Sequence, residues 1–495
     1  MFHYSAAPFE FMRASTASTY PMKFFSKACI AFIALLSAAS AAQPNIVFIM
    51  TDQQSADAMS CRMGDRYLKT PAMDRLAARG TLFTKAYSPN PLCMPARNSI
   101  FTGRYPHETG VTDNTKTTLD AAEFVSMGTY FQRAGYQTAY FGKWHLAYAE
   151  GVTKTHGFEM LETGHIDADN AALAAKFLGR KHDKPFLLVV SFLNPHNVCE
   201  LARDQKLNNG PIGEPPPVAL RPPPPANLAP PRNEPDSMTR IRAGYHANPA
   251  FPVGNFSPER WQALRWGYYR LIEKVDAEIG KVLAAVKAAG LEDNTLIVFT
   301  ADHGECAGAH GFNQKTVFYE ESARVPFIVS TPGQRTARLS EKFINTGTDI
   351  LPTMLEFAGV ARPAKLTGLS LRPLALGETV SNWRDAVVVQ NNMSQTFPVD
   401  GNVPTTEGRM LRTDRYKYCV YAHGQNRESL VNLEKDPGEM TNLARDPAHR
   451  ETLLAMRERL RKWGVENRDP LVAKMLADDV KPREFATMKA PKKQR

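Results

Sequence analysis

Four short apolar runs, each rich in Val, Ile, Leu or Phe, stand out along a chain that is otherwise mixed in polarity. They cover Asn45–Thr51, Gln137–Phe141, Phe186–Phe192 and Thr295–Thr300. Runs of this length and composition are typical of strands buried inside a sheet. The segments that separate them are long enough for helices, so the pattern predicts alternating strands and helices.

The clearest predicted helix begins after Ser257, a residue type favoured at the N-cap. Pro258 follows at the first helical position, where its missing N–H is tolerated. Apolar residues at helical spacing run from Leu264 to Val282, and Gly290 is a stop signal. Strands that alternate with helices predict an α/β fold, with a mostly parallel sheet covered by helices on both faces.

The pattern changes from about Pro373. Residues Met410–Tyr421 alternate between apolar and polar, which predicts antiparallel strands, and a helix capped by Asp446 is predicted over 447–463. We therefore expect a large α/β domain over residues 43–372, a smaller C-terminal subdomain of antiparallel sheet plus helix over 373–480, and a basic tail over 481–495.

The N-terminal segment 22–42 has the order of a secretory signal. Two lysines precede the apolar run Ala28–Leu36, and small residues follow it. The run is too short to span a bilayer, so we expect export to the periplasm or the medium and no membrane insertion after the signal is removed. Residues 1–21 lack this order, and we expect them to be an upstream extension before a natural start at Met22.

Charge adds little to this picture. The 60 Lys and Arg against 50 Asp and Glu give a net charge of +10, part of which lies in the tail. The rest suits an anionic substrate, and no basic helix or basic-aromatic repeat indicates a nucleic-acid partner.

Cysteine number raises a sharper question. One of six cysteines lies in the predicted signal, which leaves an odd number for an oxidising compartment. We expect four of the others to be packed thiols or to include one disulfide: Cys61, Cys199, Cys306 and Cys419. The fifth, Cys93, needs a different explanation.

Polar and reactive residues follow each of the four predicted strands. They are Asp52-Gln53, Lys143-Trp144-His145, Asn194-Pro195-His196 and Asp302-His303. Open parallel sheets bind ligands beyond the carboxyl ends of their strands. Each group alone could be a turn or a surface group, but four together indicate one site.

The most distinctive motif is Cys93-Met94-Pro95-Ala96-Arg97, expected in a loop and followed by Thr102-Gly103-Arg104. It resembles the signature of the type I sulfatases, which share the alkaline-phosphatase-like fold. The strand-end residues, the segment from His310 through Lys315 to Ser322, and Asp436-Pro437 follow the order of that family. The resemblance covers nearly the whole expected mature chain and implies that residues 43–372 form a catalytic sulfatase domain.

The resemblance implies that a maturation enzyme oxidises Cys93 to formylglycine, which would account for the odd thiol. A hydrated aldehyde provides one hydroxyl that attacks sulfur and a second whose deprotonation releases sulfate, so no separate ester hydrolysis is needed. The family also implies a divalent metal, with ligands Asp52, Gln53, Cys93 as formylglycine, Asp302 and His303. Oxygen ligands favour calcium, which we expect, whereas the His303 imidazole would also suit manganese or zinc.

The remaining roles follow from charge and from the place of each residue in a matched motif. Arg97 fixes the formylglycine and offsets negative charge, and Lys143 and Lys315 hold the sulfate oxygens. His145 accepts the proton whose loss drives sulfate release, and His196 contacts the substrate and protonates the leaving alcohol. The alternative is that the two lysines are ordinary surface charges and that His196 is a helix or turn histidine.

The expected function is hydrolysis of sulfate esters, with a sulfated carbohydrate as substrate. One alternative keeps the fold and the modification but changes the substrate to a phosphonate monoester or phosphodiester. Another is a non-catalytic protein that binds sulfated glycans and keeps Cys93 as a thiol. The proline-rich stretch 211–235 is expected to be an extended surface segment or a stiff wall beside the substrate cleft.

Overall fold

The computed structural model describes residues 43–477, except residues 116, 251, 394–396 and 400–403, together with residue 485. The expected extension 1–21 and signal 22–42 lie outside the described residues, and so does the basic tail apart from Phe485.

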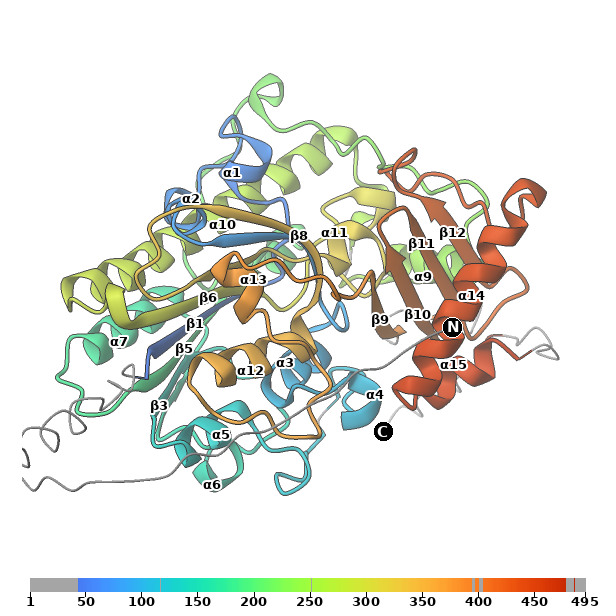
Figure 1. Ribbon diagram of the computed structural model, residues 1–495. Coiled ribbons are helices and arrows are strands. Elements are labelled where there is room, and N and C mark those ends of the chain that lie inside the picture. The colour runs from blue at the N-terminus through green and yellow to red at the C-terminus, as the bar shows by residue number, and fades with distance from the viewer. Residues whose placement is uncertain are drawn as a thin grey trace, which may run out of the picture. The chain divides into compact units, whose positions relative to one another are not determined.

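One eight-stranded sheet forms the centre of the large domain (Figure 1). Its strand order is β4 (Met160–Thr163), β3 (Gln137–Gly142), β5 (Phe186–Pro195), β1 (Asn45–Asp52), β6 (Thr295–Ala301), β7 (Phe327–Ser330), β2 (Thr81–Tyr87) and β8 (Arg338–Asn345). Only β7 runs antiparallel to its neighbours. The four strands predicted from apolar runs are β1, β3, β5 and β6, and they lie side by side and parallel.

Helices cover both faces of this sheet, because successive residues of a strand point to opposite sides. In β1, Phe48 packs on one side with α3 (Cys93–Thr102), α5 (Met127–Arg133) and α12 (Thr346–Phe357). Its neighbour Ile49 packs on the other with α2 (Pro71–Ala78), α7 (Asp167–Leu178) and α10 (Pro258–Ala288). The predicted α/β architecture is confirmed.

The long helix α10 begins where the sequence predicted. The Ser257 hydroxyl accepts a hydrogen bond from the Arg260 amide, and Pro258 is the first helical residue. The helix buries a stripe that includes Leu264, Leu271 and Val275 against the sheet, so its apolar face fixes its orientation.

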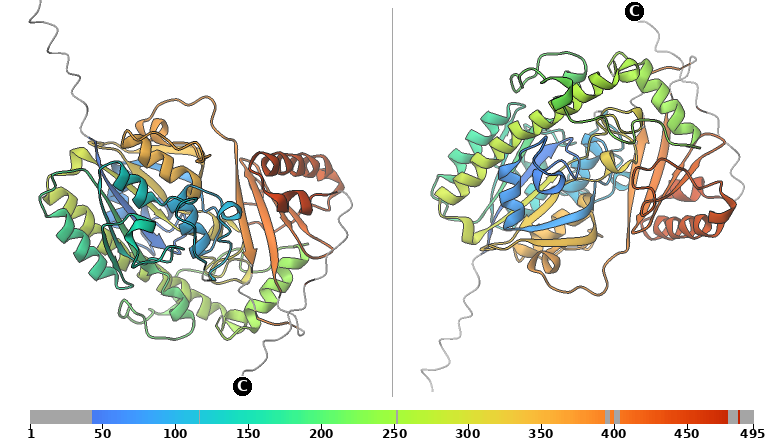
Figure 2. Two further views of the ribbon diagram at one scale, coloured as in Figure 1. Left: turned by 90° about the horizontal axis from the view of Figure 1, so that it is seen from below. Right: turned by 90° about the horizontal axis from the view of Figure 1, so that it is seen from above.

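A four-stranded antiparallel sheet follows, in the order β12 (Glu428–Asn432), β11 (Tyr416–Tyr421), β10 (Thr406–Thr413) and β9 (Ala386–Met393). Val388 and Leu411 pack under α14 (Arg450–Glu466), whereas Val389 and Met410 pack against the large domain. Figure 2 shows α14 and α15 (Pro470–Met475) on the side of the small sheet that faces away from the large one. The predicted antiparallel sheet plus helix is therefore confirmed.

The proline-rich stretch 211–235 runs along the surface and reaches the C-terminal sheet region. The Arg232 amide donates to the Met440 carbonyl at 2.9 Å, and Pro225 lies against Gly308.

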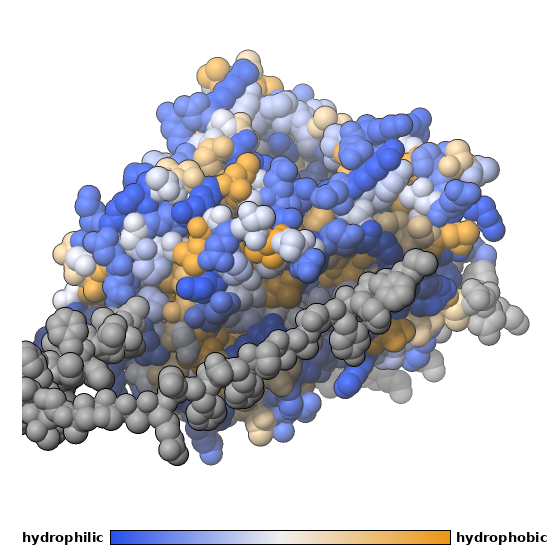
Figure 3. All heavy atoms as spheres, in the orientation of Figure 1, coloured by the Kyte–Doolittle hydropathy of each residue, from blue (hydrophilic) through white to orange (hydrophobic). Residues whose placement is uncertain are grey.

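Figure 3 shows a mostly polar face with separate apolar spots. No helix in the described part of the chain is both long and apolar enough to cross a membrane.

Candidate active site

The four central strands bring their carboxyl ends to one edge of the sheet. Asp52 is the last residue of β1, Lys143 follows β3, His196 follows β5, and Asp302 follows β6. Parallel register places these positions together, with Asp52 paired to Pro195 and the Thr51 carbonyl accepting from the Asp302 amide. The strand-end groups thus converge.

Close approach of β3 and β5 requires a glycine. Gly142 has φ +112°, and a Cβ at this position would lie 1.9 Å from the Ser191 carbonyl oxygen. The amide of Lys143 donates to that same carbonyl at 2.9 Å, which fixes where the lysine leaves the strand. Gln53 and His145 also adopt positive φ, the kind of backbone strain that clusters at functional sites.

Cys93 lies at the start of a helix, not in the loop expected from the sequence. It is the first residue of α3, and Pro95 occupies the first turn, where a proline costs no hydrogen bond. Every residue of the helix is buried, and Gly103 ends it in the left-handed conformation. The helix N-terminus favours negative charge beside Cys93.

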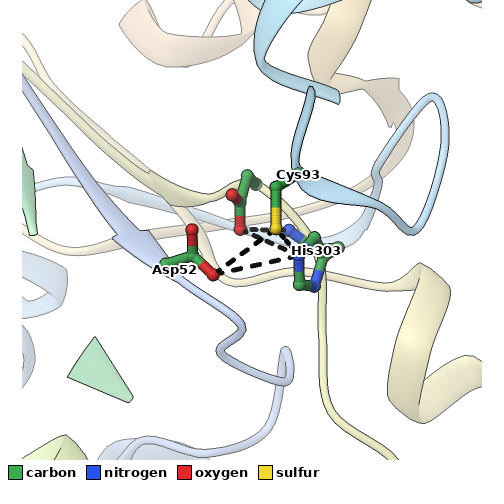
Figure 4. Close-up of side chains that lie close together, drawn as sticks. Asp52, Cys93 and His303 are labelled. Carbon is green, nitrogen blue, oxygen red and sulfur yellow. Dashed lines mark hydrogen bonds and ion pairs between the residues drawn. The ribbon is translucent and has the colours of Figure 1, made fainter. Parts of the chain in front are cut away.

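A buried cluster of potential metal ligands surrounds the Cys93 sulfur. Ligand atoms of Asp52, Cys93, Asp302 and His303 all lie within 4.8 Å of one another. The Sγ atom of Cys93 lies 3.2 Å from His303 Nε2 and 3.9 Å from Asp52 Oδ1 (Figure 4). Two carboxylates, an imidazole and the Cys93 position form a donor set that fits a divalent ion.

Neighbouring groups orient this donor set. His303 Nδ1 lies 3.0 Å from the Gly304 carbonyl, an arrangement that places a proton on Nδ1, and Nε2 is the ring nitrogen that faces the cluster. Arg97 Nη2 and Nε donate, each at 2.8 Å, to the Oδ2 atoms of Asp52 and Asp302. The Oδ1 atoms of both aspartates are therefore turned toward the inside of the cluster.

Arg97 is fully buried and uses the remaining side of its guanidinium as well. Its Nη1 donates to the Lys143 carbonyl at 3.0 Å and to Ser191 Oγ at 2.8 Å. A planar group with five donors suits this four-way contact, which a lysine could not reproduce.

Lys315 and Gln53 complete the buried centre. Lys315 Nζ lies 2.6 Å from Gln53 Oε1 and 3.4 Å from Cys93 Sγ. Gln53 Nε2 donates to Glu305 Oε2, and the backbone N–H of Gln53 donates to Asp302 Oδ1. Lys143 Nζ forms an ion pair with Asp52 Oδ2 at 2.6 Å and lies 4.0 Å from Cys93 Sγ. Lys143 therefore approaches the sulfur from the end of β3, and Lys315 approaches it from a loop elsewhere in the chain.

Burial and charge act against each other in this centre. Burial alone would raise the pKa of Asp52, but Lys143 and the other surrounding cations hold that pKa well below its usual value. Burial and the nearby Asp52 raise the pKa of Asp302. Burial would also raise the pKa of the Cys93 thiol, yet Lys143 and Lys315 outweigh it and lower that pKa strongly. The centre therefore stabilises negative charge at Asp52 and Cys93.

A cavity of about 1020 Å³ opens beside Lys143 and is also lined by His145 and His196. Burial, then Lys143 and Lys315, hold the pKa of His196 well below its usual value, so its imidazole is neutral. His145 Nδ1 is buried and has no hydrogen-bond partner among the residues that the structure describes. None of the described residues that line this cavity belongs to 211–235, so the proline-rich stretch does not form the expected wall here.

The structure adds residues that the strand-end argument did not find. His165 and Glu200 line the cavity, and Asn114 accepts a hydrogen bond from the Met94 amide at its edge. His165 comes two residues after β4, an edge strand of four residues without an apolar run, so no pattern marked its end. Glu305, two residues after His303, accepts a hydrogen bond from the side chain of Gln53.

The five cysteines of the described chain are all free thiols. Cys61 is exposed, whereas Cys199, Cys306 and Cys419 are buried, and burial raises the pKa of Cys199 and of Cys419 to about 12. The expectation of packed thiols holds for these three. Cys199 also touches the centre, because Gln53 Nε2 lies 3.4 Å from its sulfur.

Two family models match the chain. The one described as "Sulfatase" matches residues 44–360, and the one described as "N-sulphoglucosamine sulphohydrolase, C-terminal" matches residues 308–466. Among curated proteins, a Delta 4,5-hexuronate-2-O-sulfatase of Bacteroides thetaiotaomicron is 28% identical over 471 residues, with 91% of this chain and 95% of that protein covered.

Solved structures share the fold. A protein in complex with its substrate D-glucosamine-2-N,6-O-disulfate has a TM-score of 0.72 and 25% identity, with 88% of this chain and all of that chain covered. The phosphonate monoester hydrolase of Agrobacterium radiobacter has a TM-score of 0.68 and 25% identity, with 86% and 96% covered. The family match spans most of the large domain, includes Cys93 and the buried cluster, and agrees with the fold. The chain therefore belongs to the sulfatase family and is a sulfuric ester hydrolase.

Proposed function

We propose that this enzyme hydrolyses sulfate esters of carbohydrates, with formylglycine derived from Cys93 as nucleophile and a divalent metal held by Asp52, Gln53, Asp302 and His303. The observation that carries the proposal is the position of Cys93. Its sulfur lies among the acidic and imidazole ligand atoms and within 4.0 Å of two lysine ammonium groups. An attacking oxygen at this position would be stabilised as an anion, and sulfate oxygens would meet two cations.

Each side chain of the centre has a defined task in this proposal. Lys143 and Lys315 bind the sulfate oxygens, and Arg97 keeps the two aspartates correctly oriented while balancing their charge. The bound ion would supply a positive charge that favours ionisation of the attacking hydroxyl.

The two histidines in the cavity move protons. His196 is neutral in the free enzyme because it is buried near two lysines. A bound sulfate ester brings negative charge that counteracts the lysines, so we infer that His196 gains a proton with substrate and passes it to the leaving oxygen. The unpartnered Nδ1 of His145 is the basic nitrogen available to accept the proton that accompanies sulfate release.

The metal proposed is calcium, because carboxylate and amide oxygens outnumber the one imidazole nitrogen. His303 would equally accept manganese or zinc. Elemental analysis of the purified, dialysed protein distinguishes the three.

A carbohydrate substrate is supported by the cavity and by the relatives. The cavity is large enough for a sugar and is lined by hydrogen-bonding groups, among them Asn114, His165 and Glu200, that suit hydroxyl groups. Relatives of this chain include a hexuronate-2-O-sulfatase and a protein that binds a disulfated glucosamine.

A side-by-side assay tests the reaction class. We expect kcat/KM for an aryl sulfate to exceed that for the matching aryl phosphonate monoester, because the matching family model and the curated relative are sulfatases. Both esters are tetrahedral monoanions, so the two lysines and the ion alone do not separate them. The structural likeness to a phosphonate monoester hydrolase makes this comparison the decisive one. A preference for the phosphonate ester would replace the proposed activity by its closest alternative. A panel of sulfated mono- and disaccharides then identifies the sugar.

We also propose that the protein is exported through the leader at 22–42 and is activated by a formylglycine-generating enzyme. The alternative of a non-catalytic glycan binder is opposed by the arrangement itself, because binding alone does not require Lys143, Lys315 and Arg97 around a cysteine. N-terminal sequencing of the secreted or periplasmic protein tests the cleavage.

A further inference from the structure

Glu305 is a buried carboxylate whose hydrogen bonds within the described chain all come from N–H donors. It is 1% exposed, and its Oε2 accepts from Gln53 Nε2 at 2.5 Å. Its Oε1 accepts from the backbone amides of Ala307 at 2.8 Å and Gln314 at 2.5 Å. Both oxygens therefore act as acceptors, which is the behaviour of an ionised carboxylate.

This contact fixes which way round the Gln53 amide lies. An amide has a donor end and an acceptor end, and only its hydrogen-bond partners decide their order. Glu305 can only accept, so it takes the Nε2 end, and Lys315 can only donate, so it takes the Oε1 end at 2.6 Å. The carbonyl oxygen of Gln53 is thus held on the side of Lys315 and Cys93.

The same carboxylate reaches the second element of the site. The backbone N–H of Gln314 donates a hydrogen bond to Glu305, and Gln314 directly precedes Lys315 in the chain. Lys315 in turn lies 3.4 Å from the Cys93 sulfur. One buried side chain therefore ties together the segment after β1 that carries Gln53 and the loop that carries Lys315.

We propose that Glu305 is a positioning residue that sets the polarity of the Gln53 amide, so that its oxygen faces the metal centre, and that anchors Lys315 at the same time. This inference rests on the proposed metal site. Within the described chain, the Glu305 carboxylate forms no hydrogen bond with Cys93, Asp52, Asp302 or His303, and it acts through Gln53 and Gln314.

The substitution Glu305→Gln isolates the polarity because it keeps shape and volume. The oxygen of the new amide continues to accept from Ala307 and Gln314, so its NH2 group points at Gln53 Nε2. Two donors then face each other, and the Gln53 amide relieves the conflict by rotating, which presents its NH2 group to Lys315 and to the ion. Neither the ammonium nor a cation is stabilised by that group.

A double exchange restores the polarity. In Gln53→Glu combined with Glu305→Gln, the donor sits on residue 305 and the acceptor on residue 53. The hydrogen bond between them re-forms in the opposite direction, and an oxygen again faces Lys315. A structural role of Glu305 that does not pass through Gln53 provides no reason for the second substitution to compensate for the first.

Asp276→Asn is the matched control. Asp276 is 2% exposed and accepts backbone N–H groups from Ala72 at 2.9 Å and Met73 at 2.8 Å, which is the same kind of contact. In the described part of the chain, its side-chain hydrogen bonds go to α2 and to none of the active-site residues. The control therefore reports what loss of a buried carboxylate does to the fold alone.

The four proteins are compared after dialysis by metal content per chain, by thermal midpoint, and by kcat and KM for an aryl sulfate. We expect Glu305→Gln to retain metal about tenfold less tightly and to lose about tenfold in kcat, the usual range for a residue that orients a ligand. We expect the double exchange to recover most of the metal affinity, and Asp276→Asn to match wild type in metal content and kcat.

Wild-type metal retention and kcat in Glu305→Gln would overturn the inference, and so would a loss that the double exchange fails to repair. Metal loss in Asp276→Asn would overturn the inference too, because the loss of metal would then result from lower stability of the fold and not from the orientation of Gln53. If the wild-type protein holds no metal, both the proposed metal site and this inference are wrong. The other outcomes bear on the role of Glu305 alone and do not contradict the metal site.

Discussion

Replacing Cys93 by alanine should abolish turnover of an aryl sulfate while leaving the protein folded. The side chain provides the only proposed nucleophile, and loss of a nucleophile costs about 10⁴-fold or more in kcat. The fold should survive because only a sulfur is removed, and its contacts are polar ones to His303, Lys315, Lys143 and Asp52. Initial rates with saturating substrate and a thermal melt measure the two effects.

Cys419→Ala is the control for this prediction. Cys419 is equally buried but lies in β11, packed in the core between the small sheet and the large domain. We expect nearly wild-type kcat from this variant. Appreciable turnover by Cys93→Ala would show that Cys93 is not the nucleophile.

Replacing Arg97 by methionine should reduce both stability and activity. The substitution leaves Asp52 and Asp302 buried without the guanidinium that each contacts at 2.8 Å. Breaking a buried ion pair by removing one partner typically costs about 3–5 kcal/mol. The aspartates also lose their orientation, so kcat of the folded fraction should fall by about 10²-fold or more. Urea denaturation and steady-state kinetics measure these changes.

Arg409→Met separates the two consequences. Arg409 forms a comparably buried pair with Asp469, at 2.6 Å and 3.2 Å, away from the active site. We expect a similar loss of stability with unchanged kcat. If Arg97→Met and Arg409→Met lost kcat equally, Arg97 would have only a structural role.

The central strands could be predicted from the sequence because they are buried on both faces. β1, β5 and β6 are continuous apolar runs with every residue buried, which is the signal that the pattern detects. β4 and β7 have four residues each, and β8 exposes several of its residues, so none of them stands out. Strand order and the reversed β7 depend on pairings between distant segments, which local patterns do not contain.

The site was predictable to the extent that its residues follow strands. Asp52, Lys143, His196 and Asp302 were found by that rule, and the structure brings them to one edge. The helical start at Cys93 was missed because the surrounding prolines indicated a loop, although Pro95 is compatible with a first helical turn.

Contacts between side chains were beyond the reach of the sequence. Arg97 donates hydrogen bonds to two aspartates, and Glu305 accepts one from the side chain of Gln53. Each of these bonds joins residues more than 40 positions apart. His165 has no motif of its own and enters the site only because β4 lies beside β3.

The mass of the peptide that contains Cys93 tests the account most directly. The enzyme is produced together with a formylglycine-generating enzyme, digested and analysed by mass spectrometry, with aryl sulfate turnover measured on the same sample. We predict that the active protein has lost the Cys93 sulfur and carries an aldehyde that reacts with a hydrazide probe. An active sample in which Cys93 remains an intact thiol would contradict the proposed chemistry.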